Sequence, residues 1–367
     1  MSKYRAAIIG TGGISRAHAE ALKASADRVE IVACVDIDRE RAQKFAEQHG
    51  IPQSFTDAKE MLDRVKPDLV HICTPPSLHA ELSILAVRSG AWVLCEKPLC
   101  GSLAELDAIQ QAEEETGKYV SSVFQHRFGP GAAHLRQLIR EQAMGRLLVG
   151  LCNTTWYRDA AYYAVPWRGK WATELGGPTM GHGIHQIDLF LWLCGDWQEV
   201  RAMAGTLYHD IEVEDVSMAV VRFENGAMGS ITNSVLSPRE ESYLRFDFEK
   251  ATVELSHLYG YGPNNWRYTK APDADPQEFA RWSAVPEQRL GGHTAQIAAL
   301  LDSMDKGERP LVSGAEARRT IEFITALYKA AITGAPVRRG EITPDDPFYH
   351  SMNGGFGDMR KMTAKAQ

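Results

Sequence analysis

The sequence predicts an α/β protein with an N-terminal Rossmann-type doubly wound sheet and a C-terminal α+β domain whose sheet is predominantly antiparallel. As far as about residue 125, short apolar runs alternate with amphipathic helical stretches, which is typical of βαβ units and a parallel sheet. Beyond Arg127-Phe-Gly-Pro130 the apolar runs mostly follow one another directly. Because 367 residues exceed the usual size of a single hydrophobic core, we expect domains at 1–126 and 127–345 and a C-terminal tail at 346–367.

The first domain is expected to contain five parallel strands. Amphipathic helices such as Arg39–His49 and Leu78–Ser89 separate them, and prolines or glycines mark several helix ends. The predicted strands are Arg5–Ile9, Val29–Val35, Leu69–Cys73, Ala91–Cys95 and Tyr119–Phe124.

The second domain begins with a predicted helix at Ala132–Gln142 and contains an apolar helix from about Pro178 to Cys194. Asn225-Gly226 predicts a tight hairpin between two strands. The predicted strands are Leu147–Tyr157, Val200–Thr206, Val216–Phe223, Ala227–Val235, Leu244–Phe248 and Thr252–Leu255, and helices at His293–Met304 and Ala315–Thr333 close the domain.

The composition argues against several function classes. A net charge of −7 and the lack of any Lys/Arg run disfavour a nucleic-acid surface. No apolar stretch approaches the roughly 18 residues of a membrane span, and the first strand begins too early for a signal peptide, so we expect a cytoplasmic protein. The six cysteines show no metal-ligand spacing, so we expect reduced, buried thiols and no metal site.

A glycine-rich loop follows the first strand and precedes a helix. Gly10 permits the tight turn, Gly12 lets the backbone approach a pyrophosphate, and Gly13 and Ile14 complete the loop. Asp36 ends the second strand, where an acidic side chain accepts hydrogen bonds from adenosine ribose hydroxyls. This pattern predicts a dinucleotide site that favours NAD, while Arg39 and Arg41 keep NADP open as an alternative.

Glu96-Lys97-Pro98 follows the predicted strand Ala91–Cys95. The carboxyl ends of parallel strands are where open α/β sheets bind ligands, and Pro98 restrains the direction of the lysine. Partial desolvation there can lower the pKa of an ammonium group towards neutrality, as proton transfer requires. Lys97 is therefore a candidate catalytic residue.

A second group of polar residues opens the apolar helix, in the run from Gly176 to Asp188. His182 and His185 lie three residues apart, and a metal site there would lack a third ligand at a sensible spacing. A glycine-rich helix start more often brings a histidine to a ligand.

In these segments the sequence resembles the glucose–fructose oxidoreductase, inositol dehydrogenase and rhizopine catabolism (Gfo/Idh/MocA) family. The resemblance extends from about residue 4 to residue 340. The residues that carry it are Gly10-Thr-Gly-Gly13, Thr74-Pro-Pro-Ser-Leu-His79, Glu96-Lys97-Pro98, Trp167-Arg168 and Gly183-Ile-His-Gln-Ile-Asp188.

The resemblance implies NAD(P)-dependent oxidation of a CH–OH group in a sugar, amino sugar or cyclitol. Lys97 would hydrogen-bond the developing alkoxide, and His185 would accept or return the hydroxyl proton. Further cofactor contacts are expected from Thr74, Pro75, His79, Glu96 and Arg168, and substrate contacts from Gln125, Arg127, His182 and Asp188.

The chain departs from the family at one position. Many family dehydrogenases have an aspartate four residues before the histidine, whereas this chain has Gly181 there and His182 next to it. His182 is a candidate substitute in substrate binding, which unchanged kcat/KM in His182→Ala would exclude. The aromatic residues between Trp156 and Trp171 suit either a sugar face or packing between elements.

Two other functions remain compatible with the sequence, a non-catalytic NAD(P)-binding sensor on the same scaffold and an NAD-dependent glycosidase. Retention of both Lys97 and His185 favours the dehydrogenase, because a sensor needs no proton-transfer pair. A sheet face that is not covered by helices predicts a homodimer or homotetramer.

Overall fold

The computed structural model describes residues 3–286 and 292–363 of the chain. Its contacts divide the protein into two units, Met1–Val123 with His293–Arg318, and Phe124–Gly292 with Arg319–Gln367. The sequence division had kept residues 293–318 in the second domain. They join the first unit because the apolar side chains of α11 (His293–Lys306) pack into its hydrophobic core.

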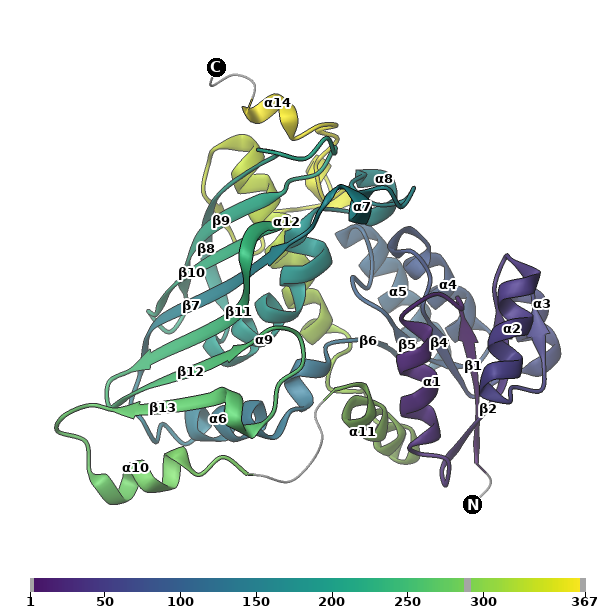
Figure 1. The fold of residues 1–367 in the computed structure, drawn as a ribbon, viewed down its shortest axis with the longest axis horizontal. Coiled ribbons are helices and arrows are strands. Elements are labelled where there is room, and N and C mark those ends of the chain that lie inside the picture. Colours follow the sequence, from purple (N-terminus) through teal and green to yellow (C-terminus); the bar gives the residue numbers. More distant parts are fainter. Residues whose placement is uncertain (1–2, 287–291, 364–367) are drawn as a thin grey trace. The chain divides into compact units, whose positions relative to one another are not determined.

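The first unit is built on a six-stranded parallel sheet with the order β3-β2-β1-β4-β5-β6, as in a Rossmann fold (Figure 1). This confirms the predicted doubly wound sheet. The strands are β1 (Tyr4–Ile9), β2 (Val29–Val35), β3 (Ser54–Phe55), β4 (Leu69–Ile72), β5 (Trp92–Cys95) and β6 (Val120–Ser122). Only β3, with two residues, had no counterpart in the prediction, because it is too short to show a periodic pattern.

Helices connect the strands of the first unit. Asp38, Asp57 and Ser102 cap three of them through side-chain oxygens that accept backbone N–H groups. The helices are α1 (Ser15–Lys23), α2 (Arg39–His49), α3 (Ala58–Val65), α4 (His79–Arg88) and α5 (Leu103–Thr116), joined by α11. Helices α1 and α11 pack side by side over the sheet, with Ala19, Leu22, Ile297 and Leu301 in one buried cluster.

The second unit contains an eight-stranded sheet with the order β13-β12-β11-β7-β10-β9-β8-β14. It is mostly antiparallel, as predicted, but β7 and β10 pair in parallel, because β7 lies far from β10 in sequence and enters between β10 and β11. Its strands are β7 (Leu147–Tyr157), β8 (Trp197–Gly205), β9 (Val216–Phe223), β10 (Met228–Ser234), β11 (Leu236–Phe248), β12 (Ala251–His257), β13 (Trp266–Lys270) and β14 (Val337–Arg338).

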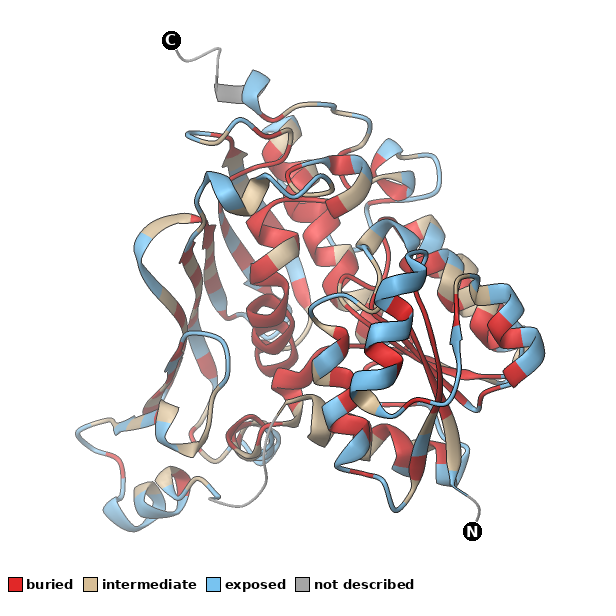
Figure 2. Ribbon diagram, turned by 45° about the vertical axis from the view of Figure 1, so that its right-hand side comes forward, coloured by how far each residue is buried: buried red, intermediate tan, exposed pale blue. Residues whose placement is uncertain are grey.

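One face of this sheet packs against α9 (Ile184–Cys194), every residue of which is buried (Figure 2). Phe190 of α9 fits over Gly150 and Gly229 of the parallel strand pair. A Cβ atom at either glycine would lie within 3 Å of its ring, so these glycines allow close approach of the helix to the sheet. The first turn before α9 is a π-helical turn at Thr179–Gly183, which the sequence pattern did not separate from the predicted helix.

The remaining helices of the second unit are mostly short. They are α6 (Pro130–Arg140), α7 (Ala160–Tyr163), α8 (Trp171–Glu174), α10 (Pro276–Ser283), α13 (Pro347–His350) and α14 (Arg360–Thr363), whereas α12 (Ala315–Thr333) runs through the division between the units. The predicted tail at 346–367 is partly folded, because Phe348, Met352 and Met359 are buried; residues 364–367 lie outside the described part of the chain.

The strands of the second sheet also expose apolar side chains. Met203, Met218, Val220 and Met228 are each more than half exposed. Such a surface is compatible with the expected homo-oligomer, which stays a prediction. Within residues 3–286 and 292–363, the structure contains no helix of the length and apolarity that a membrane span requires.

Candidate active site

The glycine loop of the first unit fits a dinucleotide phosphate. Gly10 has φ +90°, and a Cβ atom there would lie 2.7 Å from the carbonyl carbon of Cys73, so the turn requires glycine. A Cβ atom at Gly12 or Gly13 would meet nothing within 4 Å, so the fold itself leaves open space before α1. Ile14 forms the N-cap of α1 without a side-chain cap, and the N–H groups of Ser15 and Ala17 donate to the carbonyl oxygens of Gly12 and Ile14 at 3.2 and 3.0 Å.

Asp36 lies at the end of β2 and is nine-tenths buried. Its Oδ1 accepts from the Asp38 N–H at 3.0 Å and from Nη2 of Arg41 at 2.8 Å, and its Oδ2 accepts from the backbone and hydroxyl of Thr11. Burial opposes ionisation, but these hydrogen bonds lower the pKa of Asp36 overall. A ribose hydroxyl that binds Asp36 has to share or replace one of these donors. Arg41, whose side chain is 56% exposed, is the donor that can move aside.

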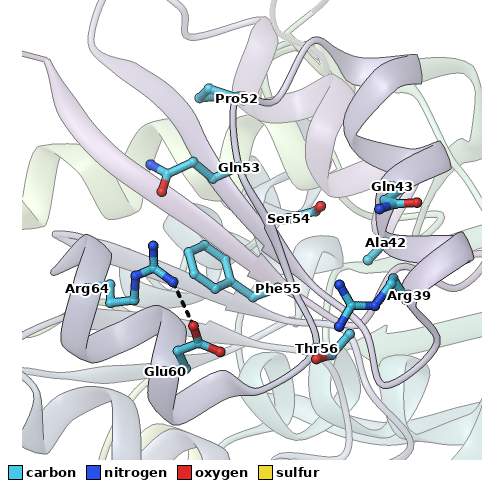
Figure 3. Close-up of a pocket in the computed structure, with 10 residues that line it drawn as sticks. All are labelled: Arg39, Ala42, Gln43, Pro52, Gln53, Ser54, Phe55, Thr56, Glu60 and Arg64. Atoms are coloured by element: carbon cyan, nitrogen blue, oxygen red, sulfur yellow. Dashed lines mark hydrogen bonds and ion pairs between the residues drawn. The ribbon is translucent and has the colours of Figure 1, made fainter.

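A hollow of about 460 Å³ lies between α2, the β3 segment and α3 (Figure 3). Phe55, Ser54 and the Arg64–Glu60 ion pair contribute to its walls. Arg39 also lines it, but none of the residues expected to contact NAD does. The hollow is therefore a feature separate from the glycine loop.

The segment after β4 carries Thr74, Pro75 and His79. The Thr74 hydroxyl is buried, and no residue in the described ranges hydrogen-bonds it, so it is available to a bound group; Pro75 is exposed. His79 differs from our expectation of a cofactor contact, because its two ring nitrogens bond the carbonyl oxygens of Pro98 at 2.6 Å and Thr74 at 2.9 Å. Burial lowers its pKa. His79 therefore connects the segment of Thr74 to the segment of Lys97 and Pro98 and helps to hold both in place.

Two histidines contact Glu96 at the end of β5, and a third histidine contacts one of these two. Oε1 of Glu96 lies 2.9 Å from Nε2 of His18 and 3.4 Å from Nε2 of His293, and Nδ1 of His18 lies 2.8 Å from Nδ1 of His71. Burial would raise the pKa of Glu96, but the two histidine hydrogen bonds hold it well below its usual value. Glu96 is thus better described as a buried carboxylate that binds two histidines than as the direct cofactor contact that we expected.

The cluster around Glu96 also contains residue types that can bind a metal ion. Within the described ranges, His18, Glu96 and His293 offer ligand atoms within 4.8 Å of one another. The hydrogen bonds within the cluster already account for its arrangement, and the expected lack of a metal site stays a prediction.

Lys97 follows this cluster directly. Its backbone N–H donates to Oε2 of Glu96 at 3.2 Å, and the Lys97–Pro98 peptide bond is cis. Strand β5 brings the lysine to the carboxyl end of the parallel sheet, as expected, next to the cluster that fixes Glu96.

In the second unit, His185 lies at the first turn of α9 among aromatic rings. The ring centroids of His126, Tyr259 and Phe124 lie 5.2, 6.0 and 6.5 Å from that of His185. The structure thus gives His185 an aromatic setting that the sequence did not reveal, because its members come from separate segments.

His182 faces a different group. Its Nε2 accepts from Nε of Arg158 at 3.3 Å and lies 3.3 Å from the Tyr162 hydroxyl, and the ring of Trp156 lies 5.0 Å away. Arg158 stacks on Trp156 at 4.9 Å. The aromatic crowding of 156–171 thus carried a signal for this cluster, although the sequence did not single out Arg158 or Tyr162.

Arg127 and Asp188 do not fit the substrate contacts that we expected of them. Two hydrogen bonds of 2.7 Å join their side chains, both fully buried, and Thr320 also donates to Asp188. This is the geometry of an internal ion pair. Gln125 is buried too, and its amide donates to the Tyr259 hydroxyl at 3.3 Å, so it supports one of the rings around His185.

Glu214 anchors the loop that leads to His182 and His185. Its oxygens accept from the backbone of Gly177 and Thr179 and from the Tyr328 hydroxyl, at 3.0–3.1 Å. Burial raises the pKa of Glu214 to about 7, although these hydrogen bonds lower it in part. No local pattern indicates this role, because Glu214 lies more than 30 residues from the loop.

Comparisons with known proteins agree with this organisation. The family model described as an oxidoreductase family with an NAD-binding Rossmann fold matches residues 4–124, and the GFO/IDH/MocA C-terminal domain model matches residues 132–254.

Characterised relatives and solved structures resemble almost the whole chain. D-apiose dehydrogenase of Paraburkholderia graminis is 26% identical over 97% of this chain and 95% of its own length, and D-glucoside 3-dehydrogenase of Escherichia coli is 26% identical over 92% and 97%. The WlbA dehydrogenase of Bordetella pertussis, solved in complex with NADH and UDP-GlcNAcA, superposes with a TM-score of 0.82 at 28% identity, covering 92% of this chain and 99% of that protein.

Proposed function

Because the chain belongs to the Gfo/Idh/MocA family of NAD-dependent oxidoreductases, we propose that it oxidises a ring CH–OH group of a sugar, amino sugar or cyclitol with Lys97 and His185 as the proton-handling pair. The coarser activity, NAD(P)-dependent dehydrogenation of a CH–OH carbon, agrees with the named relatives. The observation that carries the proposal for Lys97 is its place at the end of β5, directly after the His18–Glu96–His293 cluster.

The residues of the first unit fit NAD. The open space at Gly12 and Gly13 admits a pyrophosphate, Asp36 offers a carboxylate to the ribose, and the buried Thr74 hydroxyl has no hydrogen-bond partner in the described ranges. NAD supplies the hydride acceptor when bound. Every other task in the reaction falls to side chains of this chain.

Lys97 and His185 divide the proton chemistry. The Lys97 ammonium donates a hydrogen bond to the substrate oxygen and stabilises the negative charge that develops there as the hydroxyl proton leaves. The His185 imidazole takes the hydroxyl proton in oxidation and returns it in reduction, a role that suits the ordinary pKa range of a histidine. Tyr259, an exposed side chain whose ring lies 6.0 Å from that of His185, offers an aromatic face to the apolar face of a ring substrate.

A cofactor-reduction assay tests the proposal. Purified protein is incubated with NAD or NADP and a panel that includes D-apiose, simple glucosides, inositols and nucleotide-linked uronic acids, while NAD(P)H fluorescence is followed. Net reduction with at least one substrate is the expected result. Release of sugar without net reduction would instead indicate the glycosidase, and cofactor binding without any turnover would indicate the sensor.

A further inference from the structure

Gly181 leaves a defined space in the second unit. It lies in the π-helical turn four residues before His185. Apart from the local backbone, a Cβ atom built on Gly181 would have one neighbour within 4 Å, Oε1 of Glu174 at 3.7 Å. A carboxylate from another segment therefore lies in contact distance of the place where a side chain at 181 would begin.

Glu174 is held firmly in that place. It is the last residue of α8 and is 5% exposed. Its Oε2 accepts from the Gly169 N–H at 2.6 Å, and its Oε1 accepts from Nη1 of Arg168 at 3.1 Å. Burial of an unpaired carboxyl group is costly, and the Arg168 guanidinium and the Gly169 N–H satisfy both oxygens of Glu174 at this site.

Arg168 links Glu174 to His182. Its guanidinium stacks on the ring of Tyr162 at 3.8 Å and on Trp167 at 4.4 Å, and it also hydrogen-bonds the Tyr162 hydroxyl. That hydroxyl lies 3.3 Å from Nε2 of His182. Glu174, Arg168, Tyr162 and His182 thus form one continuous polar chain along the segment that precedes His185.

We propose that Glu174 is a positioning residue for the dehydrogenase reaction, which supplies from α8 the carboxylate that residue 181 lacks and holds Arg168 and Tyr162 in place beside His182. The proposal deepens the function proposed above and rests on it. It follows that the residues at 181 and 174 depend on each other. Gly181 has no side chain, and the carboxylate of Glu174 lies next to the space that a side chain at 181 would enter. An aspartate at 181 with Glu174 retained would bring two carboxylates into contact, which is unfavourable.

A set of four variants tests this pairing by steady-state kinetics with the best substrate from the panel. Glu174→Ala is expected to lower kcat about 100-fold, because the arginine and tyrosine lose their fixed orientation, and to leave the Kd for NADH within about twofold. Glu174→Gln, which keeps the size of the side chain but loses the charge and one of the two acceptor oxygens, is expected to lose about tenfold. Gly181→Asp alone is expected to lose about tenfold. The double variant Glu174→Ala/Gly181→Asp is expected to recover at least tenfold over Glu174→Ala, since the new carboxylate enters the vacated space.

Two controls separate positioning from folding. Glu113→Gln removes a comparably buried, arginine-paired carboxylate from the first unit, so it lowers stability with kcat unchanged. A crystal structure of Glu174→Ala, or of the double variant if the single one does not fold, gives a readout independent of turnover. Arg168 displaced from the Tyr162 ring in the Ala variant, or recaptured by the introduced aspartate in the double variant, supports the proposal.

The results that overturn the proposal are distinct from those that overturn the function. An active wild type with unaltered kcat in Glu174→Ala, or a double variant no better than Glu174→Ala, refutes the role of Glu174. An inactive wild type refutes the dehydrogenase instead, and the crystal structure then still decides whether Glu174 orients Arg168, because an unmoved guanidinium would contradict it.

Discussion

Two buried glutamates, one in each unit, have pKa values shifted in opposite directions because their hydrogen-bond partners differ. Glu96 lies against two histidine rings, and their hydrogen bonds keep its pKa well below the usual value. Glu214 lies against two backbone N–H groups and one tyrosine hydroxyl, all neutral, and burial raises its pKa to about 7. Burial alone therefore does not determine the charge of a carboxylate in this protein; partners that can themselves carry charge do.

The two glutamates also hold different segments of the chain. Glu96 accepts the backbone N–H of Lys97, the proposed catalytic residue, and so holds that segment in place. Glu214 fixes the Gly177–Thr179 loop that precedes His182 and His185, and it does so by hydrogen bonding rather than by charge. Substitution of each glutamate by glutamine, which removes the charge and keeps the size of the side chain, distinguishes stabilisation by charge from stabilisation by hydrogen bonding.

The largest effect is expected from Glu96→Gln. Removing the charge from a buried group that faces two histidines should lower the free energy of unfolding at pH 7 by about 3–5 kcal/mol. In the wild type the pKa of Glu96 is depressed, so its contribution is complete above pH 4.5 and is lost as the pH falls through the folded-state value; the variant should lack that acid-side loss. Urea unfolding at several pH values measures both.

Glu20→Gln serves as the matched control, because Glu20 pairs with Arg16 on the exposed side of α1. Its expected change is below about 0.5 kcal/mol. A Glu96→Gln change as small as this would show that the cluster is not an ionic one.

Glu214→Gln is expected to have a smaller effect with the opposite pH dependence. An acid that titrates near pH 7 when folded and near 4.5 when unfolded loses about 3 kcal/mol of stabilisation as the pH rises between those values. The variant should therefore be less stable than the wild type at pH 5 and should approach or exceed it at pH 8. Parallel stability profiles for the two proteins would contradict the raised pKa.

The smallest effect is expected at Asp36, a carboxylate with one mobile arginine partner. Asp36→Ser removes the charge that repels a 2′-phosphate and releases Arg41, so kcat/KM should fall about tenfold with NAD and rise about tenfold with NADP. Asp38→Ser, which keeps the helix cap, is the control and should leave the cofactor preference unaltered. An unaltered preference in Asp36→Ser would assign the selectivity to other residues.

The sequence predicted the first unit better than the second. The glycine loop, the parallel strands and the position of Lys97 follow from local rules, because each strand and its loop are continuous in the chain. Gly10 illustrates this, since its turn directly follows β1 in the chain. The return of α11 to the first unit was missed, because an amphipathic helix does not reveal which core it joins.

In the second unit the important neighbours come from distant segments. Gln125, Tyr259 and His126 gather around His185, and Glu214 reaches a loop more than 30 residues away. The same lack of local signal explains why Arg127 and Asp188 were expected at the substrate and form an internal ion pair instead. Polar residues near a catalytic motif look alike in sequence whether they bind a ligand or one another.

The central claim concerns Lys97, and one pair of measurements on Lys97→Met tests it most directly. Turnover with the best substrate should fall by about 10³, because the cation that stabilises the developing alkoxide is gone. The Kd for NADH, measured by fluorescence titration, should stay within about twofold of the wild type. A variant that turns over at nearly the wild-type rate would contradict the assignment of Lys97 as a catalytic residue.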